Sequence, residues 1–557
     1  MHDEKTATEG ASEDSRRRFL RRDWLALALL ALAVLVMGGP GITRGGLGWS
    51  DAPNHTLDGV FIYEFVKQWP IGHAREWAEQ FYLRYPALGI IVYYPPGFAA
   101  VEAMVFAVCG VNIVSARLTV LLFAVGTGWL MYLLGRRWFD RPTGLFAGLL
   151  LITCPHGFLW MNDVMLEWPA TFWILASVYC FERDRRSGHA RWAVMLAACI
   201  VMAYLTKQTA GFILPVLVVY ALAGRVKRGY FFNPLRLGAM LVAVCVIAGY
   251  YVATKKYAAL PSHLLVSSVD LLFYPKHLPE ILGWPLLAVA GLGMATVVFR
   301  PTRGTSGFIL LWFIAWAGFS SVIAAKEPRY FFFALPPMMF AAVRFLMRSG
   351  GAHERRIAWR TDRARIGLLA ALVLVQGGMA RAKDVGRLQR FEGAVAELVN
   401  RPDADLVLVD AVRDGQVVFD LYQNDEARRR LFPLRASKLL YARSAREKYD
   451  YEQFVESESD ILRMLDQYGI RYILIESDYP VTDYADADPP PRKLLRNLLT
   501  SDPRFRLVKA WPMRCGDSIW NNVELRLYQY PSCPPRASKT INLSIPAMGR
   551  EVTFELP

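Results

Sequence analysis

The residues best suited to chemistry follow the first apolar run of the chain. The segment Trp49 to His55 (WSDAPNH) gathers a carboxylate, an amide and an imidazole. A chain leaving a bilayer meets water at this point, so these groups could act on a substrate held at the membrane surface. A carboxylate beside an apolar interface can have a raised pKa, which suits a base. Asp51 is therefore the first candidate catalytic residue, although Asp before Ala-Pro also suits a helix N-cap.

A second pair of acids comes later in the chain. Asp163 and Glu167 are four residues apart, which predicts one face of a helix. Asp163 could orient a substrate, or share a divalent cation such as Mg²⁺ or Mn²⁺ with Asp51 through oxygen ligands. An N-cap is the alternative for Asp163. Glu167 lies deeper in the apolar run and is harder to explain as a cap.

Two basic positions are candidates for phosphate binding. Lys207 could hold a phosphate as a point cation, or extend along the apolar surface to the interface. Arg329 can bind phosphate oxygens bidentately, with Glu327 to orient it and Lys326 to assist. The alternative for these residues is that they only anchor the end of a helix at the membrane surface.

Four further residues complete the candidate set. His55 could join the Asp51 cluster, although a lone histidine is more often structural. Tyr93 and Tyr94 could line a lipid groove, but interfacial tyrosines are common. Tyr330 directly follows Arg329 and is included with the substrate-binding candidates.

The composition predicts which elements must position these residues. The 557 residues are 54% hydrophobic and 20% charged, which favours a helical membrane domain joined to a soluble one. The formal charge of +15 does not indicate nucleic-acid binding, because most basic residues fall in short connections between apolar runs.

A polytopic α-helical membrane domain is predicted for residues 24–382, after a cytoplasmic tail at 1–23. A span needs about 20 apolar residues. The apolar run at 95–111 could either cross the membrane or lie in its outer interface. Only if it lies in the interface do the later basic loops stay on the cytoplasmic side. The result is about eleven spans, an inside N terminus and an outside C terminus. Candidate spans begin near Trp24, Ile113, Thr143, Val164, Arg191, Thr209, Leu237, Ile281, Gly307, Tyr330 and Ile366.

Two outer connections are long. In 41–94, aromatic residues at helical spacing predict either interfacial amphipathic helices or a packed outer cap. The segment 254–280 is a candidate lid, because long irregular connections beside a rigid bundle often act as lids. In this topology most candidate residues lie in the outer connections, which makes a common site there a hypothesis. They are Asp51, His55, Asp163, Lys207, Lys326, Glu327 and Arg329.

Several short motifs together resemble those of a known family. They are, in order, Asp51, Tyr93-Tyr94-Pro95-Pro96-Gly97, Ala116-Arg117-Leu118, Leu133-Leu134-Gly135-Arg136-Arg137-Trp138-Phe139, Met161-Asn162-Asp163, Leu205-Thr206-Lys207-Gln208 and Glu327-Pro328-Arg329-Tyr330. Over residues 24 to about 350 the chain resembles the bacterial membrane glycosyltransferases of the GT-C superfamily, related to protein O-mannosyltransferases and lipid A aminoarabinose transferases.

The resemblance implies a function. Such enzymes move a sugar from a polyprenyl-phosphate carrier to a lipid, glycan or protein acceptor at the outer face of the bacterial inner membrane. It also implies that Asp51 is the catalytic carboxylate. No Gly-rich nucleotide loop, P-loop or CxxC pair occurs, which argues against a nucleotide-sugar donor, ATP-driven transport and a zinc site.

Two other classes of function are considered. A lipid or solute transporter would be expected to have broken helices in two repeated halves, and the sequence has no clear repeat. A sensor or assembly scaffold would not need Asp51 or Lys207.

From residue 383 to 557 the composition becomes soluble. Four strands are predicted at 405–410, 471–476, 505–511 and 523–530, with helices near 386–400, 456–468 and 492–500. They indicate a small α/β domain outside the membrane, with a structural or acceptor-recognition role. Cys515 and Cys533 could pair in an oxidising compartment or remain free thiols.

Overall fold

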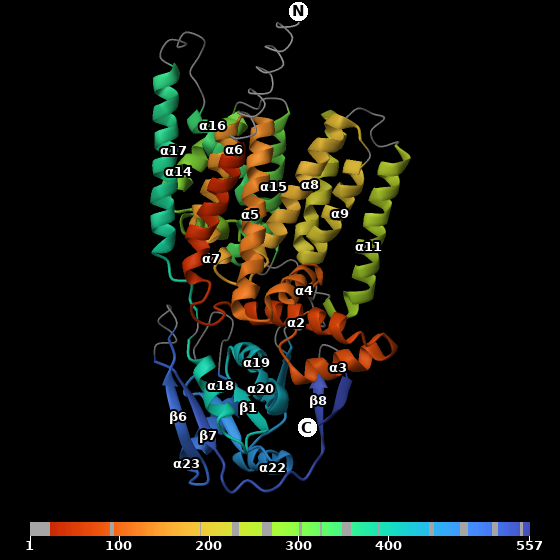
Figure 1. The fold of residues 1–557 in the computed structure, drawn as a ribbon, viewed down its shortest axis with the longest axis vertical. Coiled ribbons are helices and arrows are strands. Elements are labelled where there is room, and N and C mark those ends of the chain that lie inside the picture. Colours follow the sequence, from red (N-terminus) through yellow and green to blue (C-terminus); the bar gives the residue numbers. More distant parts are fainter. Residues whose placement is uncertain are drawn as a thin grey trace, which may run out of the picture.

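The structure of the protein is a computed structural model. It describes residues 23–89, 94–189, 191–225, 233–258, 270–299, 304–323, 326–347, 358–387, 389–444, 450–479, 488–514, 522–545 and 550–556. Within these ranges the chain forms a bundle of apolar helices, three helices across one end of the bundle, and a sheet-containing domain beyond them (Figure 1).

The bundle contains a helix at each of the predicted spans. Its elements are Asp23–Gly41, α5 (Ile113–Trp138), α6 (Arg141–Thr153), α7 (Pro155–Met161), α8 (Glu167–Ser187), α9 (Arg191–Thr206), η3 (Gln208–Phe212), α10 (Ile213–Tyr220), α11 (Pro234–Ala258), α14 (Trp284–Phe299), α15 (Thr305–Val322), η6 (Pro328–Ala334), α16 (Leu335–Met347) and α17 (Ala358–Arg381). By length and hydropathy, 6 helices in the described residues can cross a membrane, or up to 7 if α6 and α7, bent by 66°, form one span. The count of about eleven stays a prediction.

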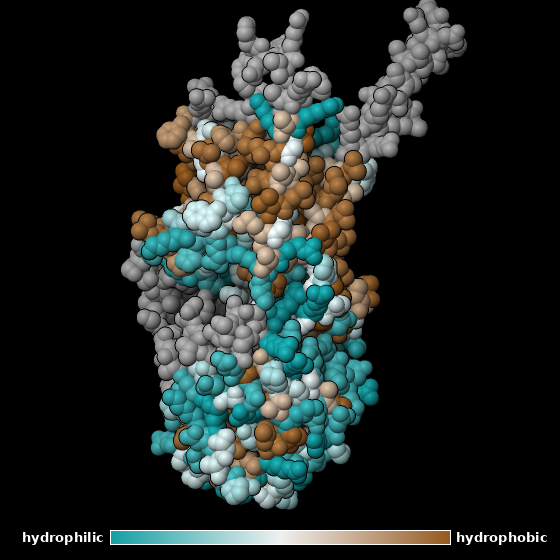
Figure 2. Space-filling model, turned by 90° about the vertical axis from the view of Figure 1, so that its left-hand side faces the viewer, coloured by the Kyte–Doolittle hydropathy of each residue, from teal (hydrophilic) through white to brown (hydrophobic). Residues whose placement is uncertain are grey.

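The surface of the bundle matches a lipid environment. Figure 2 shows hydrophobic residues gathered over its upper part and hydrophilic residues over the domain below. Large apolar side chains are exposed along the bundle helices, among them Leu241 of α11, Phe299 of α14 and Leu374 of α17. Exposed apolar surface of this extent indicates contact with lipid tails. The chain is a multi-pass membrane protein.

Three helices lie across the end of the bundle that faces the sheet-containing domain (Figure 1): α2 (Ala52–Gln68), α3 (Ala74–Arg84) and α4 (Gly97–Cys109). The 13 residues of α4 give a helix about 20 Å long, too short for a hydrocarbon core of about 30 Å. The helix follows Pro95-Pro96 and ends at Gly110, whose φ of 77° few other residues adopt. The 95–111 run therefore lies across the bundle end, as the charge pattern predicted.

The sequence left open whether residues 41–94 form interfacial amphipathic helices or a packed outer cap, and the packing of α2 on α3 answers part of this question. The ring of Trp77 lies 5.2 Å from that of Phe61 and 5.4 Å from that of Phe65, and Phe81 lies 5.4 Å from Phe61. These contacts correspond to the packed cap. In the predicted lid, residues 259–269 lie outside the described residues, and the lid stays a prediction; α13 (Phe273–Leu282) follows that segment.

The C-terminal part is an α/β domain, as predicted. Its five-stranded sheet has the order β2-β1-β5-β7-β6, in which β1 pairs parallel with β2 and β5, and β7 pairs antiparallel with β5 and β6. The apolar strands β1 and β5 are buried along their whole length, as parallel strands covered on both faces must be. The strands are β1 (Leu406–Asp410), β2 (Phe432–Arg435), β5 (Tyr472–Glu476), β6 (Arg506–Pro512) and β7 (Glu524–Gln529).

Helices and two hairpins complete this domain. The helices are α18 (Phe391–Val399), α19 (Asp414–Gln423), α20 (Asp425–Arg430), α21 (Ala436–Leu439), α22 (Glu458–Tyr468) and α23 (Pro490–Ser501), and the hairpins pair β3 (Tyr441–Ser444) with β4 (Asp450–Gln453) and β8 (Thr540–Ile545) with β9 (Arg550–Glu555). Cys533 is buried, and Cys515 lies outside the described residues, so their pairing stays a prediction.

Candidate active site

The loop between the first helix and α2 is held by buried side chains from distant parts of the chain. Arg117, at the start of α5 and 1% exposed, donates to the carbonyls of Ile42 at 3.0 Å and Gly46 at 2.6 Å. It also donates to Gly41, Arg44 and Gly45. One planar guanidinium therefore fixes the course of the chain that leads to Asp51.

The last residues before Asp51 are fixed from two sides. The Trp49 amide donates to Asp163 Oδ2 at 2.6 Å, and the Leu47 amide donates to Gln416 Oε1 at 2.8 Å. Gln416 belongs to α19 of the C-terminal domain. Arg413, beside it, donates to the Gly48 carbonyl. The position of Asp51 thus depends on both domains.

Asp51 occupies the N-cap position of α2, but its side chain makes no capping hydrogen bond. Its Oδ2 instead accepts from Arg329 Nη1 at 2.8 Å. The N-cap alternative is therefore not what the geometry shows. The carboxylate turns away from the helix that it precedes and toward a guanidinium from η6.

Arg329 is buried within an acidic and aromatic cradle. Its other nitrogens pair with the Glu327 carboxylate, with Nη2 3.1 Å from Oε1. The Trp49 ring centroid lies 5.5 Å from its Cζ and the Tyr330 centroid 5.4 Å. Cation–π contacts and two carboxylates compensate for the loss of water around a cation that is only 8% exposed.

Tyr330 also contacts a second ion pair. Lys207 Nζ is 2.7 Å from Glu167 Oε1 and 5.3 Å from the Tyr330 ring centroid. Glu167 is fully buried, and its Oε2 has no hydrogen-bond partner among the described residues. Since Tyr330 contacts both Lys207 and Arg329, the two cations and their carboxylates form one cluster.

His55 lies on α2, one turn beyond Asp51, with its ring 4.4 Å from that of Tyr94. Burial lowers the pKa of His55 from 6.5 to about 4, despite the opposing effect of Asp51, so the ring is neutral at pH 7. For Asp51 itself, burial raises the pKa, but Arg329 and His55 lower it by more, leaving the pKa below its ordinary value. The expectation of a raised pKa was wrong because the sequence did not reveal the guanidinium partner.

Asp163 is placed differently from the sequence prediction. It was expected to share a helical face with Glu167, but α8 begins only at Glu167. Pro169 explains this start, because proline lacks an amide donor and is tolerated only in the first turn. The two oxygens of Asp163 accept from the backbone amides of Trp49 and Val164. Its carboxylate therefore supports the loop beside Asp51.

The remaining candidates have different positions. Lys326 donates to the carbonyls of Ser320 and Ser321 at the end of α15, an interaction typical of a cation at a helix C-terminus. Tyr94 packs on His55, while Tyr93 lies outside the described residues.

The geometry does not favour a cation shared by Asp51 and Asp163. In the described part of the chain no group of three or more His, Cys, Asp or Glu side chains is placed to hold a metal ion. Asp51 is paired with a guanidinium, and each oxygen of Asp163 accepts a backbone amide. A divalent cation shared by these two residues remains a hypothesis from the sequence, and the chemistry proposed for Asp51 does not use it.

Sequence reasoning missed several residues that position the site. Gln416 and Arg413 lie in the other domain, where no local signal connects them with Asp51. Trp49 was part of the initial segment, but its contact with Arg329 could not be foreseen from it. This contact depends on the fold, which brings together parts of the chain that are far apart in the sequence, as the pair of Asp51 and Arg329, 278 positions apart, also shows. Arg117 was named in the sequence only as part of the motif Ala116-Arg117-Leu118, without its role in holding the loop before Asp51.

Comparison with known proteins gives matches over different parts of the chain. Residues 94–252 match the family model described as dolichyl-phosphate-mannose-protein mannosyltransferase. A curated undecaprenyl phosphate-alpha-4-amino-4-deoxy-L-arabinose arabinosyl transferase 1 of Pseudomonas fluorescens is 28% identical over 281 residues, 44% of this chain. The match spans about half, 48%, of that relative.

Solved structures match the fold of nearly the whole chain. ArnT from Cupriavidus metallidurans bound to undecaprenyl phosphate has a TM-score of 0.58 at 16% identity, covering 92% of this chain and 98% of that one. The oligosaccharyltransferase of Archaeoglobus fulgidus has a TM-score of 0.55 at 12% identity, covering 82% and 69%. The chain therefore has the fold of ArnT and of the archaeal oligosaccharyltransferase, the fold expected from the resemblance to the GT-C glycosyltransferases, and parts of it are similar in sequence to a protein mannosyltransferase family and to an arabinosyl transferase.

Proposed function

We propose that this protein transfers a sugar from a polyprenyl-phosphate carrier to a lipid, glycan or protein acceptor at the outer face of the bacterial inner membrane. The observation that carries the proposal is the cluster of Asp51, Arg329, Lys207 and Glu167 at one end of the bundle. The relative from Pseudomonas fluorescens is named for an undecaprenyl-phosphate sugar, which supports the choice of donor class.

Sugar transfer from a phosphate ester breaks the bond between the anomeric carbon and the phosphate oxygen and forms a bond from that carbon to the acceptor. The acceptor hydroxyl or amine loses a proton, and the carrier leaves as a phosphate monoester. A site for this reaction must accept the proton and stabilise the negative charge that develops on phosphate. Asp51 supplies the acceptor oxygen, and Arg329 and Lys207 supply the positive charge.

The ion pair suggests how donor binding prepares Asp51. In the described conformation Arg329 neutralises Asp51, which makes the carboxylate a weak base. A donor phosphate would compete for the same guanidinium, because arginine binds phosphate oxygens bidentately. The pKa of Asp51 rises as Arg329 is shared, so proton acceptance is coupled to a filled donor site. The aromatic contacts from Trp49 and Tyr330 hold Arg329 in place during this exchange.

The other candidates surround these groups. We assign donor or acceptor binding to His55, Tyr93, Tyr94, Glu167, Lys326, Glu327 and Tyr330, and support of the catalytic loop to Asp163. The α/β domain that holds the loop through Gln416 contributes to acceptor recognition.

The test uses the purified full-length protein with a panel of polyprenyl-phosphate sugars and a set of lipid, glycan and peptide acceptors, with products identified by mass spectrometry. We expect transfer from one polyprenyl-phosphate sugar and none from nucleotide sugars. In parallel, the protein in liposomes is tested for movement of the carrier lipid between leaflets. Movement of lipid without any transferred sugar would favour the transporter and contradict the proposal.

A further inference from the structure

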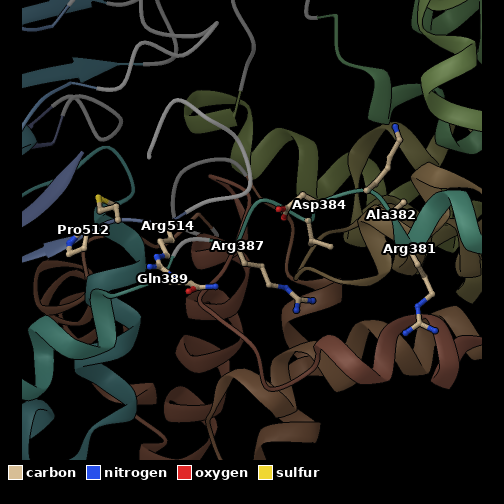
Figure 3. A pocket seen from close by; sticks show the side chains of 10 residues that line it. Arg381, Ala382, Asp384, Arg387, Gln389, Pro512 and Arg514 are labelled. Carbon is tan, nitrogen blue, oxygen red and sulfur yellow. The ribbon is translucent and has the colours of Figure 1, made fainter. Parts of the chain in front are cut away.

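A polar cavity lies at the junction between the bundle and the C-terminal domain, lined by none of the residues of the Asp51 cluster. It has a volume of about 940 Å³. Figure 3 shows its residues arranged from Arg381, at the end of α17, past Arg387, to Arg514 and Pro512 at the end of β6.

The cavity is strongly positive. Four of its residues are cations, Arg381, Lys383, Arg387 and Arg514, and Asp384 is its one acid. Asp384 accepts from the Gly386 amide at 2.9 Å, within its own turn. Among the described residues no carboxylate forms an ion pair with any of the four cations. Lys383 donates to the Glu280 carbonyl, and Arg387 donates to the backbone of the loop before Asp51 and to Asn162.

The fold, rather than the local sequence, assembles this charge. The Gln389 amide donates to the Arg514 carbonyl at 3.1 Å in an isolated β-bridge, which brings Arg514 beside the segment that follows α17. Like charges gathered in one cavity repel each other, and an anion bound among them relieves the repulsion. Basic residues are also depleted near span ends on the outer side of a membrane, so a cluster at this end of α17 is an exception.

The surface above the cavity indicates a lipid rather than a free anion. The apolar side chains of Leu368, Val375 and Met379 are spaced along one face of α17, and each is at least 40% exposed. Leu374 is 76% exposed. Leu374 is seven residues before Arg381 and so lies on the same face of α17, which places an exposed apolar side chain two turns above a residue that lines the cavity. This arrangement matches an acyl chain above a charged head group.

We propose that this cavity binds the phosphate head group of an anionic membrane lipid, whose acyl chains lie along α17. Arginine binds phosphate oxygens bidentately and lysine binds them as a point charge. The inference does not require sugar transfer. It requires only that this end of the bundle lies at a membrane surface, as the exposed apolar helices indicate.

The test titrates the full-length protein in detergent micelles with phosphatidylglycerol, phosphatidylcholine or inorganic phosphate, and counts bound lipid by native mass spectrometry. The variant carries Arg381→Gln, Lys383→Gln and Arg514→Gln. Each basic residue near an anionic membrane surface contributes about fivefold to binding, so the triple variant should bind phosphatidylglycerol at least about tenfold more weakly. Arg463→Gln, Lys493→Gln and Arg506→Gln, three exposed cations of the C-terminal domain, form the matched control and should leave binding unchanged.

Three results would overturn the proposal: equal binding of phosphatidylglycerol and phosphatidylcholine, unchanged binding by the triple variant, or displacement of the lipid by equimolar inorganic phosphate, which would indicate a soluble anion. Unfolding temperatures of both triple variants establish that they fold. Arg381→Lys with Arg514→Lys keeps the charge but not the bidentate geometry, so it should bind phosphatidylglycerol more tightly than the triple glutamine variant. Binding by this lysine pair no tighter than that of the glutamine variant, if both fold normally, would also contradict the proposal.

Discussion

At the scale of single residues, the central feature is a half-buried carboxylate that a buried guanidinium keeps ionised. Asp51 has an oxygen 2.8 Å from Arg329, and Arg329 also pairs with Glu327. Removing one partner of a buried ion pair costs about 3–5 kcal/mol, because the other charge is left without compensation. The sequence indicated both residues as candidates for a common site, but not that they would form a direct ion pair, since residue type carries no information about such a distant partner.

The neutral His55 gives a pH dependence. Its pKa is lowered from 6.5 to about 4, so between these values the folded protein binds fewer protons than the unfolded chain. Stability therefore rises with pH in this window, by about 3 kcal/mol for a shift of this size. We expect His55→Gln to reduce this slope. Unfolding curves in detergent at several pH values from 4 to 6.5 measure it, and the exposed His73→Gln should behave as wild type. A slope unaffected by His55→Gln would show that another group is responsible.

The dependence on metal can be measured directly. Because both oxygens of Asp163 accept backbone amides and Asp51 is paired with Arg329, we expect transfer to persist after the protein is dialysed against EDTA. The rate should stay within about twofold of the untreated rate. Loss of activity that Mg²⁺ or Mn²⁺ restores would instead establish the shared cation considered from the sequence.

At the scale of elements, the site depends on helix ends rather than helix middles. Glu167 opens α8, Lys207 lies between α9 and η3, and Arg329 is in η6. The apolar runs predicted these helices well, because a membrane span leaves a strong signal in the sequence. Their ends were less predictable. The start of α8 depends on Pro169, and the strand β2 was missed because its four residues give too short a pattern.

The Lys207–Glu167 pair links two of these ends, and its two roles can be separated. Lys207→Gln leaves the buried Glu167 without its partner, so we expect destabilisation of about 3–5 kcal/mol and weaker donor binding. The double variant Lys207→Gln/Glu167→Gln removes both charges and should regain most of the stability. Its KM for the donor should remain at least about tenfold raised, because a charged hydrogen bond contributes about 1.5–3 kcal/mol. A double variant with a normal KM for the donor would show that this pair stabilises the fold but does not bind the donor.

At the scale of the whole molecule, the two domains are joined around the candidate site. Tyr422 of α19 donates to Glu64 of α2 at 2.6 Å, and Gln416 holds the amide of Leu47. The composition predicted a membrane domain followed by an α/β domain, and four of its strands were placed correctly. These contacts could not be predicted, because each residue that makes them resembles an ordinary surface position in its own domain.

The proposed topology places the C-terminal domain outside the cell membrane and the start of α17 inside. In a chain whose seven cysteines are replaced by serine, we introduce Lys493→Cys, exposed on α23, or Arg363→Cys, exposed near the start of α17. A membrane-impermeant maleimide should label position 493 in cells with a permeable outer membrane and an intact inner one. Position 363 should react only after the inner membrane is opened. The reverse pattern would place the site on the cytoplasmic side.

The most direct test of the account is the rate of sugar transfer by Asp51→Asn with the polyprenyl-phosphate sugar that the wild type uses. The amide keeps the size of the side chain but removes its charge and basicity, so we expect kcat to fall at least about 100-fold. Asp23→Asn, which disrupts another carboxylate–arginine pair in the first helix, serves as the control and should retain transfer when folded. Transfer by a folded Asp51→Asn protein at the wild-type rate would contradict the account.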